Sequence, residues 1–170
     1  MMKSLLLAMF LPFCVAAAAE IHSQTVENVK THEVKDTPVR VVPVTDGATP
    51  KHVIYMIGDG MGAEQVCAAW ICNKGKLNIT RLPITGLSKT YSASHLVTDS
   101  AAGGTALACG RRTNNGWLGL APDRTPLVSL AATARSNGMA TGLVVTKAIT
   151  DATPAAFYAH VDDRNKAKQI

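Results

Sequence analysis

Two small-residue corners constrain what this chain can fold into. In the first, an apolar run at 53–57 leads into the glycine-rich stretch 58–62 (GDGMG). In the second, Asp99 and Ser100 precede a run of small residues, within 98–106 (TDSAAGGTA). A short apolar run that ends at glycines is typical of a buried parallel strand, and ligands bind beyond the carboxyl ends of such strands. We therefore expect Asp59 and Ser100 to meet at one edge of an α/β sheet.

The second corner allows two interpretations. Ser100 is predicted at the N-cap of a helix, where free N–H groups and the helix dipole favour an anion. The small residues that follow would let a ligand approach the backbone. An ordinary capped helix that packs closely through small residues predicts the same pattern, so the corner alone leaves both open.

Strand-like and helix-like segments alternate along the chain, which favours a parallel α/β sheet. Residues 111–124 are predicted as loop, with a turn at 114–116 (NNG). We expect strands at 53–57, 86–92 and 140–146, and helices at 64–72 and at 127–135, the second closed by residues 137–138.

The first residues have the pattern of an export signal. A basic head at Lys3 precedes an apolar run and an Ala-x-Ala context before Glu20. We predict a signal peptide at 1–19, a mature N-terminal arm at 20–50 and a catalytic region at 51–170. Acylation at Cys14 is the weaker alternative, and the apolar run is too short for a comfortable membrane span. The protein is therefore expected to be periplasmic or secreted, with no membrane span after cleavage.

The charge distribution and the cysteine spacing argue against nucleic-acid binding and against a cysteine-based zinc site. The net charge of +5 is spread without a dense basic run, which does not favour nucleic-acid binding. Cys67, Cys72 and Cys109 include no Cys-x-x-Cys pair, so a cysteine-based zinc site is not expected. We predict that these cysteines are small buried hydrophobes and that Cys67 and Cys72 do not bridge.

Ser100 needs activation to act as a nucleophile. Ionising a serine hydroxyl at neutral pH costs on the order of 11 kcal/mol, whereas a helix terminus supplies at most about 2 kcal/mol. Either a general base or a metal must supply the rest. His95 would be the base of a Ser–His hydrolase, the runner-up mechanism. Metal activation is favoured because Asp59, Asp99 and Asp151 all follow apolar runs and precede small residues.

An ordered set of motifs resembles the alkaline phosphatase family over about residues 51–166. The matching pieces are 57–62 (IGDGMG), 98–102 (TDSAA), 104–106 (GTA), 113–116 (TNNG), 141–144 (TGLV), 151–156 (DATPAA), 159–161 (AHV) and Arg164. This resemblance implies an α/β three-layer sandwich with a mostly parallel sheet. It also implies hydrolysis of phosphate monoesters through a phosphoserine on Ser100, assisted by two zinc ions and magnesium.

The resemblance assigns roles residue by residue. Asp59 would bind zinc and magnesium, Ser100 zinc, and Thr153 magnesium, with Asp151 in the magnesium shell through water. Arg164 would clamp the phosphate, and Asp99 would orient Arg164 and limit its grip on product. Without the resemblance, Asp151 and Thr153 form a helix cap before Pro154 as N1 residue, and Arg164 is a surface charge.

The sequence also departs from the family pattern. The remaining zinc and magnesium ligands of the family are absent, which predicts an incomplete alkaline phosphatase-like chain that is inactive and poorly stable alone. The complete protein is expected to be a homodimer. The alternatives are an exported phosphate-binding pseudoenzyme module and a related sulfatase or phosphodiesterase.

Overall fold

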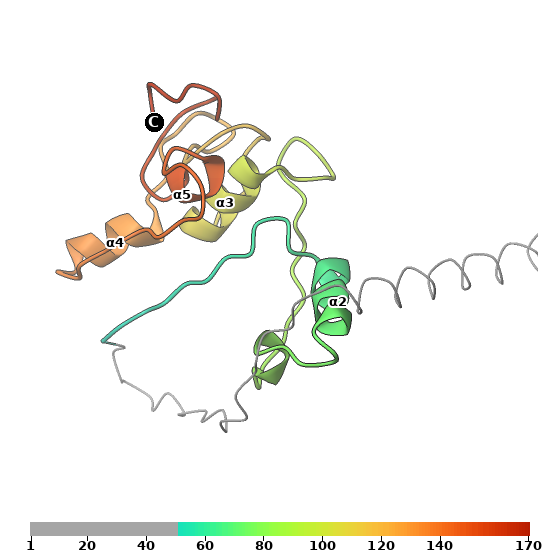
Figure 1. Ribbon diagram of the computed structural model, residues 1–170. Coiled ribbons are helices and arrows are strands. Elements are labelled where there is room, and N and C mark those ends of the chain that lie inside the picture. Colours follow the sequence, from blue (N-terminus) through green and yellow to red (C-terminus); the bar gives the residue numbers. More distant parts are fainter. Residues whose placement is uncertain (1–50) are drawn as a thin grey trace, which may run out of the picture. The chain divides into compact units, whose positions relative to one another are not determined.

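The computed structural model describes residues 51–170, which divide into two compact units between Gly86 and Leu87 (Figure 1). The predicted signal peptide, the N-terminal arm and Cys14 lie outside the described residues. No helix in residues 51–170 is long and apolar enough to cross a membrane. The helices are α2 (Ala63–Cys72), the 3-10 helix η1 (Ile79–Arg81), α3 (Ser100–Cys109), α4 (Leu130–Ser136) and α5 (Ala152–Ala155).

Helix α2 is the main element of the first unit, and it confirms the helix predicted at 64–72. The amide of Gly62 donates to the side chain of Gln65 at 3.0 Å, which satisfies one donor before the first turn. The helix stops at Asn73, and Gly75 then takes a positive φ of 78°. None of the ten α2 residues is buried. Amphipathic burial therefore does not stabilise this helix within the described part of the chain.

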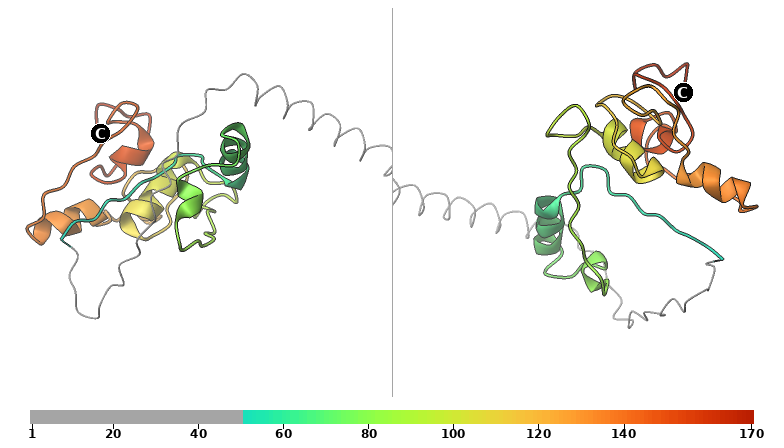
Figure 2. Two further views of the ribbon diagram at one scale, coloured as in Figure 1. Left: turned by 60° about the horizontal axis from the view of Figure 1, so that its bottom comes forward. Right: turned by 180° about the vertical axis from the view of Figure 1, so that it is seen from behind.

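Helices α3 and α5 pack against each other in the second unit, residues 87–170 (Figures 1 and 2). Gly104 allows this approach, because a Cβ there would lie 3.2 Å from the Thr153 Cα and 3.3 Å from the Ala156 Cβ. The small residues of α3 thus have a packing role, as one of the two interpretations predicted. Its buried residues are Ala101, Ala102, Gly104, Thr105 and Ala108.

A loop crosses this helix pair and completes the core. The buried Thr105 hydroxyl accepts the Gly119 amide at 3.0 Å and donates to the Trp117 carbonyl at 3.3 Å. Leu118, which is fully buried, exchanges two main-chain hydrogen bonds with Val161, at 2.8 and 3.0 Å. Gly119 has a φ of 59°, and a Cβ there would collide with the Ala159 carbonyl oxygen. Only glycine fits this position.

Helix α4 begins three residues later than predicted. The Ser129 hydroxyl accepts the Ala132 amide at 3.1 Å and donates to the Phe157 carbonyl at 2.6 Å. The Leu127 amide, at the predicted start, donates instead to the Gly119 carbonyl at 2.8 Å, outside any helix. The predicted end is confirmed, since Asn137 is the C-cap and Gly138 has a φ of 76°. A local cap bond and a tertiary contact, neither of which helical periodicity reports, meet at the Ser129 hydroxyl where the helix starts.

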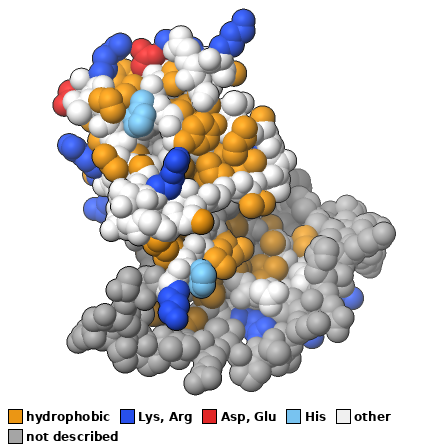
Figure 3. All heavy atoms as spheres, turned by 90° about the vertical axis from the view of Figure 1, so that its left-hand side faces the viewer, with side chains coloured by type: hydrophobic (Ala, Val, Ile, Leu, Met, Phe, Trp, Pro, Cys, Tyr) orange, Lys and Arg blue, Asp and Glu red, His pale blue; other side chains and the backbone are white. Residues whose placement is uncertain are grey.

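None of the three predicted strands is formed in residues 51–170, which contain two isolated bridges and no strand. A strand requires hydrogen bonds to a neighbouring strand, whereas apolar alternation reports only side-chain pattern. In 86–92, the Arg112 guanidinium donates instead to the Tyr91 carbonyl at 2.9 Å. Segments 53–57 and 140–146 leave large side chains exposed, including Val144 at 100%. Figure 3 shows apolar side chains exposed on one face of the described residues.

The cysteine prediction is half right. Cys67, Cys72 and Cys109 are all free, so Cys67 and Cys72 do not bridge. They are not buried, however: Cys67 is exposed and the other two are intermediate. Cys67 and Cys72 lie on α2, which buries nothing in the described part of the chain.

Candidate active site

Helix α3 begins one residue earlier than the predicted N-cap at Ser100 implies. Asp99, with extended backbone, is the N-cap, and its carboxylate accepts the Ala102 amide at 2.9 Å. Ser100 is therefore the first helical residue, of intermediate exposure. Both residue types cap helices well, and Asp99 takes this role because its carboxylate reaches the amide three residues ahead. The serine side chain is thus not needed as the cap.

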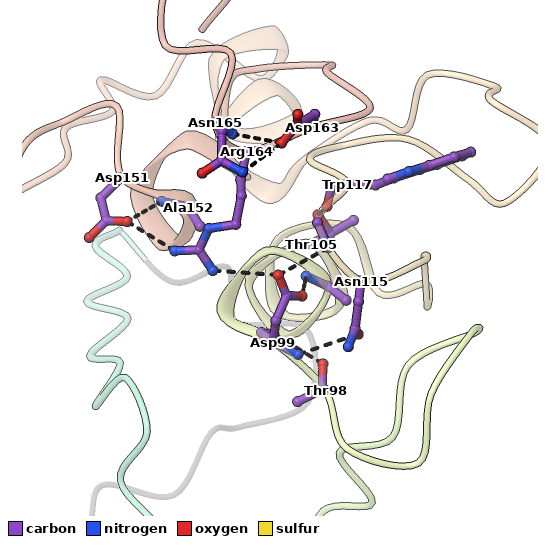
Figure 4. A network of polar contacts seen from close by, with 12 residues as sticks. Thr98, Asp99, Thr105, Asn115, Trp117, Asp151, Ala152, Asp163, Arg164 and Asn165 are labelled. Carbon is purple, nitrogen blue, oxygen red and sulfur yellow. Dashed lines mark hydrogen bonds and ion pairs between the residues drawn. The ribbon is translucent and has the colours of Figure 1, made fainter.

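Arg164 lies between two carboxylates in the second unit (Figure 4). Its Nη1 is 3.4 Å from Oδ2 of Asp99, and its Nη2 is 3.2 Å from Oδ1 of Asp151. All three side chains are about 30% exposed, at 30%, 27% and 29%. A guanidinium has five N–H donors, so these two contacts leave donors for a further anion. The structure thus brings together Arg164, the residue that the resemblance assigns to the phosphate clamp, Asp99, which would orient it, and Asp151, which the resemblance assigns to magnesium.

Asp151 also caps α5, as the alternative to a magnesium role predicted. Its Oδ1 accepts the Ala152 amide at 2.8 Å, and its Oδ2 is 3.8 Å from Nζ of Lys147. The amide hydrogen bond, with the charges of Lys147 and Arg164, lowers the pKa of this carboxyl. Helix α5 starts at Ala152, so Pro154 is its third residue and not the predicted N1 residue. Thr153 is the second residue and is half-buried.

The turn at 114–117 connects Asp99 with Arg164. Asn115 bonds to the Asp99 main chain, and Gly116 bonds to both the Asp99 carboxylate and the Arg164 amide. The sequence identified this stretch correctly as a turn. It gave no signal that the turn supports the site, because the partners lie far away along the chain.

Asp59 belongs to the other compact unit and is exposed. Its loop is tight: the Met61 amide donates to the Gly58 carbonyl at 3.2 Å, and Gly60 has a φ of 67°. Glycine meets this requirement at little steric cost. The loop therefore presents the carboxylate on an irregular turn. Its predicted meeting with Ser100 stays a prediction.

The second unit holds two oxygen donors of the kind that suits magnesium. Asp151 and Thr153 offer carboxylate and hydroxyl oxygens, the donor type that magnesium prefers. A catalytic zinc normally has three protein ligands. Residues 51–170 contain no group of three or more His, Cys, Asp or Glu side chains able to hold a metal.

His95, the base of the runner-up mechanism, is engaged by another serine. Its Nδ1 is 2.7 Å from the Ser94 hydroxyl, and its amide donates to the Ser92 hydroxyl at 3.0 Å. His160 directs its Nε2 to the Leu127 carbonyl at 2.9 Å. These contacts give the two histidines structural roles.

Comparison with known proteins identifies relatives of this chain. The family model described as alkaline phosphatase matches residues 50–170. The repressible alkaline phosphatase of Saccharomyces cerevisiae is 43% identical over 124 residues, which cover 67% of this chain and 21% of the yeast enzyme. The streptomycin-6-phosphate phosphatase of Streptomyces griseus is 43% identical over 127 residues, covering 69% and 28%.

Solved structures extend the likeness to the fold. The alkaline phosphatase of the Antarctic bacterium TAB5 has a TM-score of 0.62 and 42% identity, covering 65% of this chain and 32% of that chain. A mutant of that enzyme has been solved with Mg bound in its M3 site. The present chain thus spans about a fifth to a third of the length of these relatives. The match over residues 50–170 shows that the chain belongs to the alkaline phosphatase family.

Proposed function

We propose that the protein carrying this chain hydrolyses phosphate monoesters through a phosphoserine on Ser100. The observation that carries this proposal is the ion pair between Arg164 and Asp99. Asp99 is the residue immediately before Ser100, at the start of α3. A guanidinium can hold two phosphate oxygens in a planar fork, and first-turn amides favour the same charge. Family membership supports the same reaction class.

The reaction has two displacements at phosphorus. The Ser100 oxygen forms a bond to phosphorus while the ester bond breaks, and the leaving alcohol takes a proton. Water then attacks the phosphoserine, which restores the serine hydroxyl and releases inorganic phosphate. Arg164 holds phosphoryl oxygens through both steps, and Asp99 orients the guanidinium. The chain's own groups thus position the phosphoryl group along its path.

Metal ions complete the proposal. Asp59 would contribute to zinc and magnesium, Ser100 to one of two zinc ions, and Thr153 to magnesium, with Asp151 in the magnesium shell through water. The oxygen chemistry of Thr153 and Asp151 supports the magnesium part. Such ions, when bound, stabilise the charge on the attacking and leaving oxygens of an in-line displacement.

We further propose an architecture and a location for the protein that carries this chain. Segments 53–57 and 140–146 would become strands of a mostly parallel sheet in a three-layer sandwich, because their exposed apolar side chains suit a covered sheet. The pattern at 1–19 supports export to the periplasm or the medium. A homodimer is proposed from the family resemblance.

The test compares substrate classes on the protein that carries this chain. We expect hydrolysis of an aryl phosphate to exceed that of an aryl sulfate or a phosphate diester by at least about a hundredfold. Ser100→Ala should abolish turnover, whereas Ser136→Ala, on the exposed end of α4, should not. Faster sulfate or diester hydrolysis would assign another esterase class. Phosphate binding without alcohol release would favour a phosphate-binding module.

A further inference from the structure

We propose that Asn115 is a positioning residue for phosphate binding, acting through Asp99 on Arg164. This inference rests on the proposed function, because Arg164 is taken to hold the phosphoryl group. Asn115 touches neither Ser100 nor Arg164 in the hydrogen bonds described; it fixes the main chain from which Asp99 projects (Figure 4).

Asn115 makes three hydrogen bonds to the segment that precedes α3. Its Oδ1 accepts the Asp99 amide at 3.3 Å, and its Nδ2 donates to the Val97 carbonyl at 3.0 Å. Its own amide donates to the Ser94 hydroxyl at 3.0 Å. The side chain thus bonds one residue on each side of Thr98, so it sets the direction in which the chain enters the helix. An asparagine suits this position because one amide group both accepts and donates.

Gly116 extends the connection to both members of the ion pair. Its amide donates to Oδ2 of Asp99 at 3.0 Å, and its carbonyl accepts the Arg164 amide at 2.7 Å. Its φ of 84° favours glycine. A single turn therefore bonds the Asp99 main chain, the Asp99 carboxylate and the Arg164 main chain.

The ion pair cannot supply this order alone. The Arg164–Asp99 contact is 3.4 Å long, between side chains about 30% exposed, and such pairs hold their geometry weakly. The hydrogen bonds of the turn to the main chain of Val97, Asp99 and Arg164 constrain more, because they fix the points from which both side chains extend. The turn thus pre-organises the guanidinium, so that phosphate binding need not order it.

The experiment measures the affinity of the protein for inorganic phosphate, with its melting temperature as the folding control. We expect Asn115→Ala to weaken phosphate binding about tenfold. Asn114→Ala is the matched control, because Asn114 serves the turn through its main-chain carbonyl, which accepts the Trp117 amide at 3.2 Å. It should bind phosphate like the wild type. Asn115→Asp, which keeps the acceptor and loses the donor, replaces Asn115→Ala if that variant unfolds.

A double-mutant cycle separates positioning from a merely structural role. In an Arg164→Ala background, Asn115→Ala should cause no further loss of phosphate affinity, because its effect passes through Arg164. Additive losses, or wild-type affinity of Asn115→Ala, would overturn the inference, as would a wild type that binds no phosphate. A wild type that binds phosphate and hydrolyses no ester contradicts only the proposed function, because the cycle is still readable.

Discussion

Helices α2 and α3 are each ten residues long and rich in small side chains, yet only α3 is part of a core. Five α3 residues are buried, whereas none is buried in α2. A carboxylate caps α3, and the amide before α2 is satisfied by a glutamine side chain. The difference lies in the partner: Gly104 of α3 admits α5, while α2 has no such neighbouring helix in the described residues. Burial thus follows tertiary contact more than composition.

The largest expected effect comes from closing the gap between α3 and α5. Gly104→Val should destabilise the protein by about 3 kcal/mol, because the new side chain meets the Thr153 backbone. The matched change on α2, Ala68→Val at an exposed position, should cost about 0.5 kcal/mol. Urea unfolding monitored by circular dichroism measures both. Equal costs would mean that the two helices do not differ in packing.

Removing the cap of α3 should also cost more stability than removing the side chain that caps α2, but by a smaller margin. Asp99→Ala removes acceptors for the Ala102 and Gly116 amides and should cost about 2 kcal/mol. Gln65→Ala removes the acceptor for the Gly62 amide at an exposed site and should cost about 0.5 kcal/mol. The same unfolding measurement applies. A larger cost at Gln65 would reverse the comparison.

The sequence predicts the features that depend on neighbouring residues and misses those that depend on distant partners. Local signals were sufficient for α2, for the turn at 114–116 and for the end of α4, because each depends on neighbouring residues. Signals that depend on distant partners failed. Ser129, the N-cap of α4, is also held by its bond to Phe157, and the three predicted strands lack ladder partners in the described residues.

In the candidate site, too, local patterns indicated some residues and could not indicate others. Glycines after an apolar run pointed to Asp59, and a polar corner pointed to Ser100, without reference to contacts. The pairing of Arg164 with Asp99 spans sixty-five positions and came only from the family resemblance. No local pattern could indicate Asn115 as support for that pair, because its role depends on the fold of the loop around α3.

Acid should weaken the second unit modestly. Hydrogen bonding by Lys166, together with the charges of Lys166 and Arg124, lowers the pKa of Asp162. A carboxyl with a lowered folded pKa stabilises the protein above its ordinary pKa, near 4, and loses that contribution as pH falls through the folded value. Asp162→Asn should therefore lower the melting temperature at pH 6 and change it little at pH 3. A difference that persists at pH 3 would exclude this linkage.

The smallest expected difference between α2 and α3 is in the reactivity of their cysteine thiols, and it does not involve protein stability. Cys67 on α2 is exposed, whereas burial raises the pKa of Cys109 on α3 and reduces its thiolate fraction. Alkylation followed by peptide mapping should label Cys67 at least about tenfold faster. The variants Cys67→Ser and Cys109→Ser show which cysteine gives the fast labelling and which gives the slow labelling. Equal rates would mean that the Cys109 end of α3 opens as readily as α2.

We propose that the start of α3, where Asp99 and Arg164 pair, carries the reacting serine. The most direct measurement traps phosphate on the protein that carries this chain at mildly acidic pH and maps the labelled peptide. We expect covalent phosphate on Ser100 and loss of the label in Ser100→Ala. Label on another residue, or continued ester hydrolysis by Ser100→Ala, would contradict the proposal.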